Sequence, residues 1–190
     1  MSNSPSFDRQ NLEIFKWPEL AQAFGPLSRL CLSEGALARS LKAEAFTILS
    51  LASGCRHCQA HGGYMLHLAG KPDERIQALW DFERSDLFTD AERAVLQFAL
   101  AAGSTPNAVT PDHYAALRLY YSDPQITKLL AVVAISGFLN RYSDTLSVVT
   151  DQESVDWASQ ILGPVGWTQG KHIGSVDEQR ASFPHMPEGH

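Results

Sequence analysis

Helix start and stop signals recur along the whole chain, and they limit its fold more than any other feature. Thr89-x-x-Glu92 and Ser122-x-x-Gln125 are capping boxes, in which the side chains at the two ends satisfy each other's backbone N–H groups. No segment shows the alternation of apolar and polar residues that marks a half-buried strand. We therefore expect an all-α fold, a helical bundle.

Eight helices are expected from these signals together with the apolar periodicity. Thr110-Pro111 supplies an N-cap followed by proline at the first helical position. Ser40 is the candidate N-cap of the second helix, and Gly70 follows the end of the third. The expected helices are Glu19–Leu32, Leu41–Ala52, Cys55–Ala69, Pro72–Phe82, Asp90–Ala102, Pro111–Tyr121, Pro124 to about Val149, and Ser154–Leu162.

The chain divides into one domain, residues 1–162, and a carboxyl-terminal tail, residues 163–190. The tail carries glycine, proline, histidine and isolated apolar residues without periodicity, so it is expected to be disordered or to lie as an arm over another surface. Trp167, Ile173 and Phe183 would be left exposed on a monomer. We therefore expect a homo-oligomer in which the tail crosses a subunit boundary.

Composition excludes several classes of protein. Of 190 residues, 44% are hydrophobic, which is enough to form a core. The net charge of −6 and the lack of a basic cluster argue against a nucleic-acid partner. The longest nearly apolar run, Leu129–Leu139, is far shorter than the ~20 residues of a membrane span. Because the first residues are polar and lack a secretory signal, we expect a soluble, cytoplasmic protein without a membrane partner.

The cysteines point to chemistry rather than to a structural framework. Three cysteines in a chain of this size do not make the disulfide scaffold of a secreted mini-domain. Cys55 and Cys58 form a C-x-x-C pattern, which in a cytosolic chain indicates redox activity or a metal site.

The residues around this pattern favour thiol chemistry. If a helix begins near Cys55, both sulfurs lie in its first turn, where free N–H groups and the helix dipole favour the thiolate. Cys58 and His61 are three residues apart and are therefore neighbours on one helix face. A histidine there can take a proton from a thiol and return it to a leaving group. Cys55 is close enough to resolve a sulfenic acid on Cys58, and His57 adds another protonatable group.

Glu44 is the candidate carboxylate partner of this group. In one unbroken helix it would lie roughly 16 Å from Cys55 along the axis, too far for a hydrogen bond. It reaches the dithiol only if the chain bends at Ser53-Gly54, or through a bridging water. A proton relay through Glu44 therefore depends on that break.

Three stretches together resemble the alkylhydroperoxidase D-like, or carboxymuconolactone decarboxylase-like, proteins, and most of all their peroxidase-related branch. They are the dithiol segment Ser50–His61, the segment Asp90–Ala99 with the residues that follow it, and Phe138–Arg141 with Asp144. The resemblance spans roughly residues 40–150. It implies an all-α fold, trimers or hexamers, no cofactor, and a reversible dithiol that reduces peroxides.

Residue roles also follow from this resemblance. Cys58 corresponds to the thiol that attacks the peroxide, Cys55 to its resolving partner and His61 to the proton carrier. Two departures matter. Alkylhydroperoxidase D itself has its histidine four residues after the second cysteine, whereas His61 follows Cys58 by three, a spacing associated with the peroxidase-related branch. The family glutamate falls on Ala43, so that either Glu44 substitutes for it or the relay is lacking. His57 stands where the family often has tyrosine and is a second candidate for proton transfer.

Other interpretations remain open at this stage. The two cysteines are alternatively inert, or part of a zinc site with His61, for which Cys31 or His57 would be the fourth ligand. Haem attachment is disfavoured because Gln59, not histidine, follows the pattern. The sequence predicts a thiol-dependent peroxidase acting on small or organic hydroperoxides, with an external dithiol or a disulfide reductase as electron donor. The alternatives are a decarboxylase of the same fold and a non-catalytic redox sensor.

Overall fold

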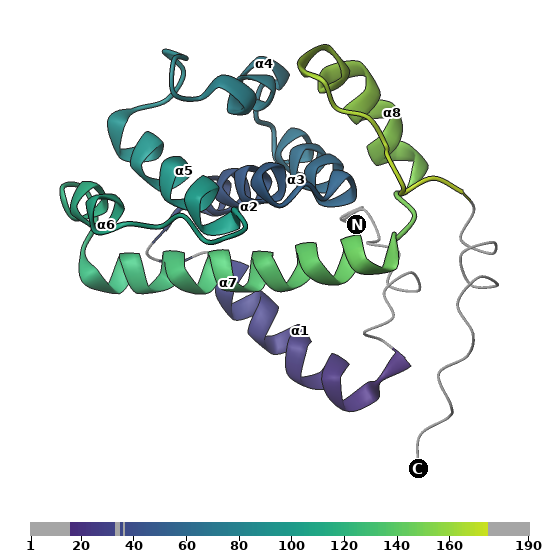
Figure 1. Ribbon diagram of the computed structural model, residues 1–190, viewed down its shortest axis with the longest axis horizontal. Helices are drawn as coiled ribbons and strands as arrows, with labels where there is room; N and C mark the ends of the chain where they lie inside the picture. The colour runs from purple at the N-terminus through teal and green to yellow at the C-terminus, as the bar shows by residue number, and fades with distance from the viewer. Residues whose placement is uncertain (1–15, 33–34, 36, 175–190) are drawn as a thin grey trace.

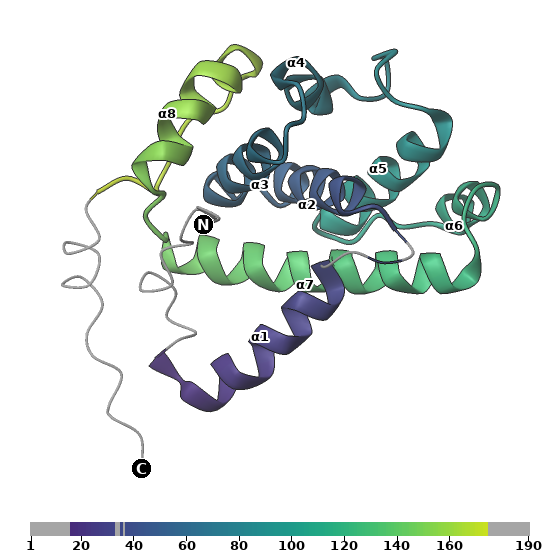
Figure 2. The same ribbon diagram turned by 180° about the vertical axis from the view of Figure 1, so that it is seen from behind.

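The computed structural model describes residues 16–32, 35 and 37–174, and all regular structure within these ranges is helical (Figures 1 and 2). The predicted all-α class is therefore confirmed. None of the described helices is both long enough and apolar enough to cross a membrane. The elements are α1 (Pro18–Leu32), α2 (Arg39–Ser53), α3 (Arg56–Leu68), α4 (Asp73–Gln77), the 3₁₀ helix η3 (Ala78–Asp81), α5 (Asp90–Gly103), α6 (Pro111–Arg118), α7 (Asp123–Leu146), α8 (Gln152–Ile161) and the 3₁₀ helix η4 (Gly163–Val165).

Helix α2 lies at the centre of the bundle. It packs against α3, α5 and α7, and α8 covers the outer side of α3. Helix α1 packs on the opposite side of α7, away from the core (Figures 1 and 2). Ile48 of α2, Phe98 of α5 and Val132 of α7 are among the fully buried side chains. Both α2 and α3 are therefore held by a continuous apolar core.

The strongest start signals are confirmed and the weakest one is wrong. Thr89 and Ser122 form the capping boxes of α5 and α7. Ser40 is not an N-cap: α2 begins at Arg39, and its N-cap is Ala38, which makes no side-chain bond. The helix expected over residues 72–82 is divided into α4 and η3. Ile76 and Leu79 are both buried, and this i, i+3 pair lies on one face where the chain tightens to 3₁₀ geometry.

Helix α7 ends at Leu146, earlier than the expected position near Val149. Ser147 adopts the left-handed conformation, with φ of 51°, and the Val148 N–H donates to the Ser143 carbonyl at 3.0 Å. This turn directs the chain into a buried connection, Val148–Thr150, that leads to α8. The early end of α7 thus brings residues 148–151 beside α3.

The first part of the tail packs on its own chain. Trp167 is buried, and its indole N–H donates to the Arg56 carbonyl at 3.1 Å. His172 is also buried, and its carbonyl accepts the Thr150 N–H at 3.2 Å. Ile173, in contrast, is 64% exposed, so the crossing of a subunit boundary by the tail stays a prediction. Phe183 lies outside the described residues.

Candidate active site

A break between α2 and α3 sets the position of the two sulfurs. Gly54 ends α2 in the left-handed conformation, with φ of 77°, which costs a residue with a Cβ roughly 1–2 kcal/mol. Cys55 then becomes the N-cap of α3, and its Sγ accepts the Cys58 N–H at 3.4 Å. The prediction that both cysteines lie at a helix N-terminus, after a Ser-Gly break, is confirmed. Only the first helical residue differs, because α3 begins at Arg56.

Both thiols are free and buried, with exposed fractions of 0% for Cys55 and 3% for Cys58. A hydrogen bond from the Cys58 thiol is the largest influence on Cys55. Together with interactions with His172 and the Cys58 N–H, it lowers the pKa of Cys55 to about 6 against the effect of burial. The same bond, with burial, raises the pKa of Cys58 well above its ordinary value, although Ser143 opposes the shift. Of the two sulfurs, Cys55 is therefore the one that ionises more readily.

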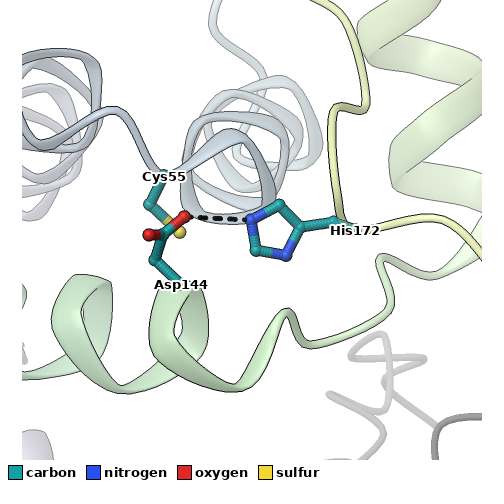
Figure 3. Close-up of side chains that lie close together, drawn as sticks. All are labelled: Cys55, Asp144 and His172. Carbon is teal, nitrogen blue, oxygen red and sulfur yellow. Dashed lines mark ion pairs between the residues drawn. The ribbon is translucent and has the colours of Figure 1, made fainter.

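His172 from the tail and Asp144 from α7 complete the surroundings of Cys55 (Figure 3). The reactive atoms of these three side chains all lie within 4.8 Å of one another. His172 Nε2 is 3.4 Å from an Asp144 carboxylate oxygen, and the other oxygen accepts from the Lys171 ammonium at 2.8 Å. Burial disfavours protonation of His172, but its interactions with Cys55, the Val148 carbonyl and Asp144 raise its pKa overall.

His61 has a carboxylate partner that the sequence did not suggest. Its Nε2 forms a short hydrogen bond with Asp151, the N-cap of α8, whose other oxygen accepts the Ser154 N–H at 2.9 Å. Burial opposes ionisation of Asp151, yet the bond to His61 holds the pKa of this carboxyl well below its ordinary range. His61 is therefore oriented by an ionised carboxylate, as proton carriers commonly are.

His57 lies between the other two histidines. Its ring centroid is 4.2 Å from that of His61 and 5.7 Å from that of His172. Burial first, and then the two neighbouring imidazoles, hold the pKa of His57 well below its ordinary value. Its Nδ1 is paired with the Thr150 hydroxyl at 3.1 Å. His57 is thus a neutral spacer at neutral pH, and the structure does not place it as the primary proton carrier.

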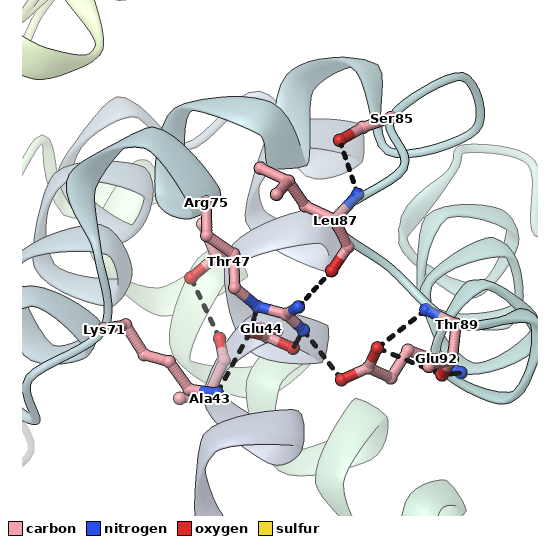
Figure 4. Close-up of polar contacts among 9 residues, drawn as sticks. All are labelled: Ala43, Glu44, Thr47, Lys71, Arg75, Ser85, Leu87, Thr89 and Glu92. Carbon is pink, nitrogen blue, oxygen red and sulfur yellow. Dashed lines mark hydrogen bonds and ion pairs between the residues drawn. The ribbon is translucent and has the colours of Figure 1, made fainter.

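Glu44 is paired with Arg75 and not with the dithiol (Figure 4). Its carboxylate receives two hydrogen bonds from Arg75, at 2.8 and 3.1 Å, and Lys71 lies 3.9 Å away. Arg75 also donates to Glu92 at 2.7 Å, so the cluster joins α2, α4 and α5. The expected relay from Glu44 to the dithiol is therefore not formed. The carboxylate that pairs with His61 is Asp151 instead.

The zinc set considered from the sequence is not assembled. His61 and His57 are committed to Asp151 and Thr150, and Cys31 belongs to α1. Within the described part of the chain, the group with converging ligand-type atoms is Cys55, Asp144 and His172. The Lys171 ammonium already lies against Asp144 and supplies a positive charge there. We therefore interpret this group as a site of proton transfer instead of a metal site.

Solved structures with the same arrangement of helices identify the fold. The debrominase Bmp8, in a cysteine-to-alanine variant bound to 2,3,4-tribromopyrrole, is 28% identical, with a TM-score of 0.75 over 81% of this chain and 87% of that one. A peroxidase-related protein from Ralstonia eutropha JMP134, described as an alkylhydroperoxidase AhpD core, is 22% identical, with a TM-score of 0.65 over 73% of this chain and 74% of that one. This chain has the alkylhydroperoxidase D-like fold. The resemblance seen in the sequence is thereby confirmed at the level of structure.

A sequence comparison adds a similar protein over a shorter stretch of the chain. The uncharacterized protein YnjA of Escherichia coli (strain K12) is 27% identical over 75 residues, which are 40% of this chain and 41% of YnjA. The match therefore spans less than half of that protein. No family model matches the chain.

Three functional candidates were missed by reasoning from the sequence. Asp151 carried only a capping signal, since Asp151-x-x-Ser154 precedes the last helix. Asp144 was noted only for its place in the resemblance. His172 belongs to a segment without periodicity, so no local pattern pointed to it. All three reach α3 through contacts between residues far apart in the sequence.

Proposed function

We propose that the chain is a thiol-dependent peroxidase that reduces small hydroperoxides through a Cys55/Cys58 dithiol–disulfide cycle. The observation that carries this proposal is the pair of free sulfurs at the N-terminus of α3, one helical turn from a histidine that is paired with a carboxylate. A thiolate is the reactive form of cysteine, and a second thiol one turn away makes the oxidation reversible. Access to a cytosolic thiol pool would return the disulfide to the dithiol, which is why we also propose a cytoplasmic location.

The cycle balances in three steps. The thiolate attacks the outer oxygen of the peroxide, the O–O bond breaks, and the sulfur becomes a sulfenic acid while the leaving oxygen takes a proton. The second thiol then attacks the sulfenic sulfur, which forms the disulfide and releases water. An external dithiol or a disulfide reductase supplies the two electrons that restore both thiols.

His61 is proposed to carry the proton of Cys58, its neighbour on α3. His61→Ala is expected to slow peroxide turnover by roughly 10–100-fold, because positioned proton transfer contributes about that much. Steady-state consumption of hydrogen peroxide, measured against pH, checks this. His67→Gln is the matched control, since His67 is exposed at the far end of α3 and pairs with Asp73. Full activity in His61→Ala contradicts the assignment.

Burial of the dithiol favours a small substrate. Cys55 and Cys58 expose 0% and 3% of their surface, so hydrogen peroxide or a short-chain hydroperoxide reaches the sulfurs with the least rearrangement. A second candidate, reductive dehalogenation, is favoured by the likeness to Bmp8, which was solved with a bromopyrrole. Replacing a C–Br bond by C–H consumes the same two thiols and releases bromide and a proton, and it leaves the same disulfide.

One experiment separates these functions. The reduced protein is incubated with dithiothreitol and either hydrogen peroxide or 2,3,4-tribromopyrrole, and peroxide loss and bromide release are followed. Continuous peroxide consumption with little bromide release supports the peroxidase. Bromide release without peroxide turnover favours the dehalogenase. A single oxidation without turnover indicates a redox sensor, and a decarboxylase would survive loss of both cysteines.

We also propose that the protein is a homo-oligomer of the trimer or hexamer type, with α1 and the outer face of α7 at the interface. Helix α1 buries none of its residues, and Leu30 is 74% exposed. Phe138 of α7, whose ring centroid lies 5.0 Å from that of Phe24 in α1, is 39% exposed. An apolar helix left this open is typical of a surface that a second copy covers.

Sedimentation measurements test the oligomer. The wild type is expected to sediment as a trimer or larger species at micromolar concentration, and Leu30→Glu is expected to shift it towards monomer because a charge would be buried at the interface. Arg84→Glu, at an exposed position outside α1 and α7, serves as the control. A monomeric wild type contradicts the proposal.

A further inference from the structure

The tautomer of His172 is fixed by the backbone. Its Nδ1 lies 2.8 Å from the Val148 carbonyl, which only accepts, so Nδ1 carries a proton in every protonation state. The neutral ring therefore presents its lone pair at Nε2. That atom is buried without a fully formed hydrogen bond, although His172 as a whole is only 1% exposed. It faces the Cys55 sulfur and an Asp144 oxygen (Figure 3).

A buried, unsatisfied lone pair beside a thiol is costly unless it receives a proton. Cys55 is the donor within reach, and the resulting thiolate would also accept the Cys58 N–H at the N-terminus of α3. The resulting imidazolium would face Asp144, whose oxygen lies 3.4 Å from Nε2. The thiolate is thus stabilised by an N–H donor, and the imidazolium by a carboxylate.

We propose that His172 is a second proton carrier of the dithiol and that it makes Cys55, not Cys58, the sulfur that attacks first. Asp144 is the positioning residue that favours the protonated imidazole. This inference rests on the proposed dithiol chemistry, and it reverses the two cysteine roles that the family resemblance implies. His172 then exchanges protons with Cys55, and His61 with Cys58. The ring of His57 lies between the rings of these two histidines.

The proton balance assigns one step to each histidine. His172 takes the Cys55 proton, and after the thiolate has broken the O–O bond it returns that proton to the leaving oxygen. Cys58 then condenses with the Cys55 sulfenic acid. His61 takes the Cys58 proton and gives it to the departing hydroxide, which leaves as water. No proton is gained or lost over these two steps. The external dithiol later supplies the protons and electrons that restore both thiols.

The charged groups around the pair are of both signs. The ionised Asp151 faces His61, and the ammonium of Lys171 contacts Asp144. His57 packs between the outer rings and, being neutral, adds no charge at neutral pH. Cys58 donates to Cys55. Loss of His172 removes the proton acceptor but leaves the Cys58 donor in place, so a partial shift of the Cys55 titration is expected rather than a complete return to its ordinary value.

Arg56 lies between the two cysteines and makes the test direct, because trypsin separates Cys55 and Cys58 into different peptides. The reduced full-length protein is alkylated briefly with iodoacetamide over a range of pH, quenched, digested and analysed by mass spectrometry. Cys55 is expected to be alkylated before Cys58, with an inflection near the pKa of about 6 that its surroundings give it. In His172→Gln the inflection is expected to rise towards that of a free thiol, and the rate at neutral pH is expected to fall roughly three- to tenfold.

His67→Gln is the control and is expected to match the wild type, since this exposed histidine pairs with Asp73 away from the sulfurs. Because iodoacetamide is not a peroxide, the result does not depend on whether the protein turns over peroxide. Alkylation of Cys58 before Cys55 in the wild type overturns the proposal even if His172→Gln does not fold. An unchanged inflection in folded His172→Gln, or stoichiometric Zn²⁺ binding that His172→Gln abolishes, overturns it as well.

Discussion

Replacement of either Cys55 or Cys58 by serine is expected to reduce continuous peroxide turnover by a factor on the order of 10³ or more. Serine is nearly isosteric with cysteine, but its hydroxyl is neither a comparable nucleophile nor able to form a disulfide. Both sulfurs are buried and hydrogen-bond to each other, so losing one also removes the hydrogen bond that shifts the pKa of the other. Peroxide consumption in the presence of an excess of dithiothreitol measures the effect.

Cys31→Ser is the matched control, because this third cysteine belongs to α1 and is not part of the dithiol. It is expected to retain wild-type turnover. If Cys55 attacks first, Cys58→Ser still forms one sulfenic acid per subunit, which a dimedone probe detects, whereas Cys55→Ser does not. The opposite labelling would restore the roles implied by the resemblance. Turnover that survives in both single variants would exclude a dithiol cycle altogether.

Most of the fold could be predicted because its signals are local. The capping boxes at Thr89 and Ser122 act within one helical turn, and the helices begin where these residues place them. Gly54 is a further local signal: its left-handed conformation breaks the chain between α2 and α3, which puts Cys55 at the start of a helix. The ends that were misplaced are those that depend on tertiary packing, such as the division of α4 from η3 and the early end of α7.

The candidate site could be predicted only where it lies within one helix. Cys55, Cys58 and His61 belong to a single segment, so their neighbourhood followed from spacing alone. The residues that orient them come from elsewhere: Asp151 bonds to His61 across 90 residues of sequence, and His172 arrives from the tail. Helical periodicity carries no information about how an aperiodic segment docks. The role of His172 therefore could not be predicted before the path of this segment over α3 was known.

Glu44 illustrates the opposite error, in which a nearby sequence position suggested a contact that does not form. The sequence offered a bend at Ser53-Gly54, and the bend is present. The Glu44 carboxylate nevertheless pairs with Arg75. A guanidinium donates two parallel hydrogen bonds to a carboxylate, whereas a histidine donates at most one. A competing partner on α4 decided the outcome.

Arg75→Ala is expected to destabilise the fold by about 3–5 kcal/mol, which is what breaking a buried ion pair from one side typically costs. Glu44 is 2% exposed, and among the described residues it would keep Lys71, at 3.9 Å, as its counter-charge. Arg75 also donates to Glu92 at 2.7 Å and to the Leu87 carbonyl, and it covers the ring of Phe88 at 4.4 Å. Three helices would thus lose a common link. Chemical denaturation measures the loss, and the melting temperature should fall by roughly 6–20 °C for a chain of this length.

Arg84→Ala is the matched control, because Arg84 is 84% exposed and only 3.6 Å from an exposed Asp81. It is expected to change the free energy of unfolding by no more than about 0.5 kcal/mol. Adding Glu44→Gln to Arg75→Ala should recover part of the loss, since the uncompensated charge is then removed. Because Glu44 contacts neither thiol, Glu44→Gln alone should lower stability without slowing turnover by the folded protein. A tenfold slower Glu44→Gln enzyme of unchanged stability would instead show that Glu44 serves the dithiol as a proton relay, and that Arg75 releases it during the reaction.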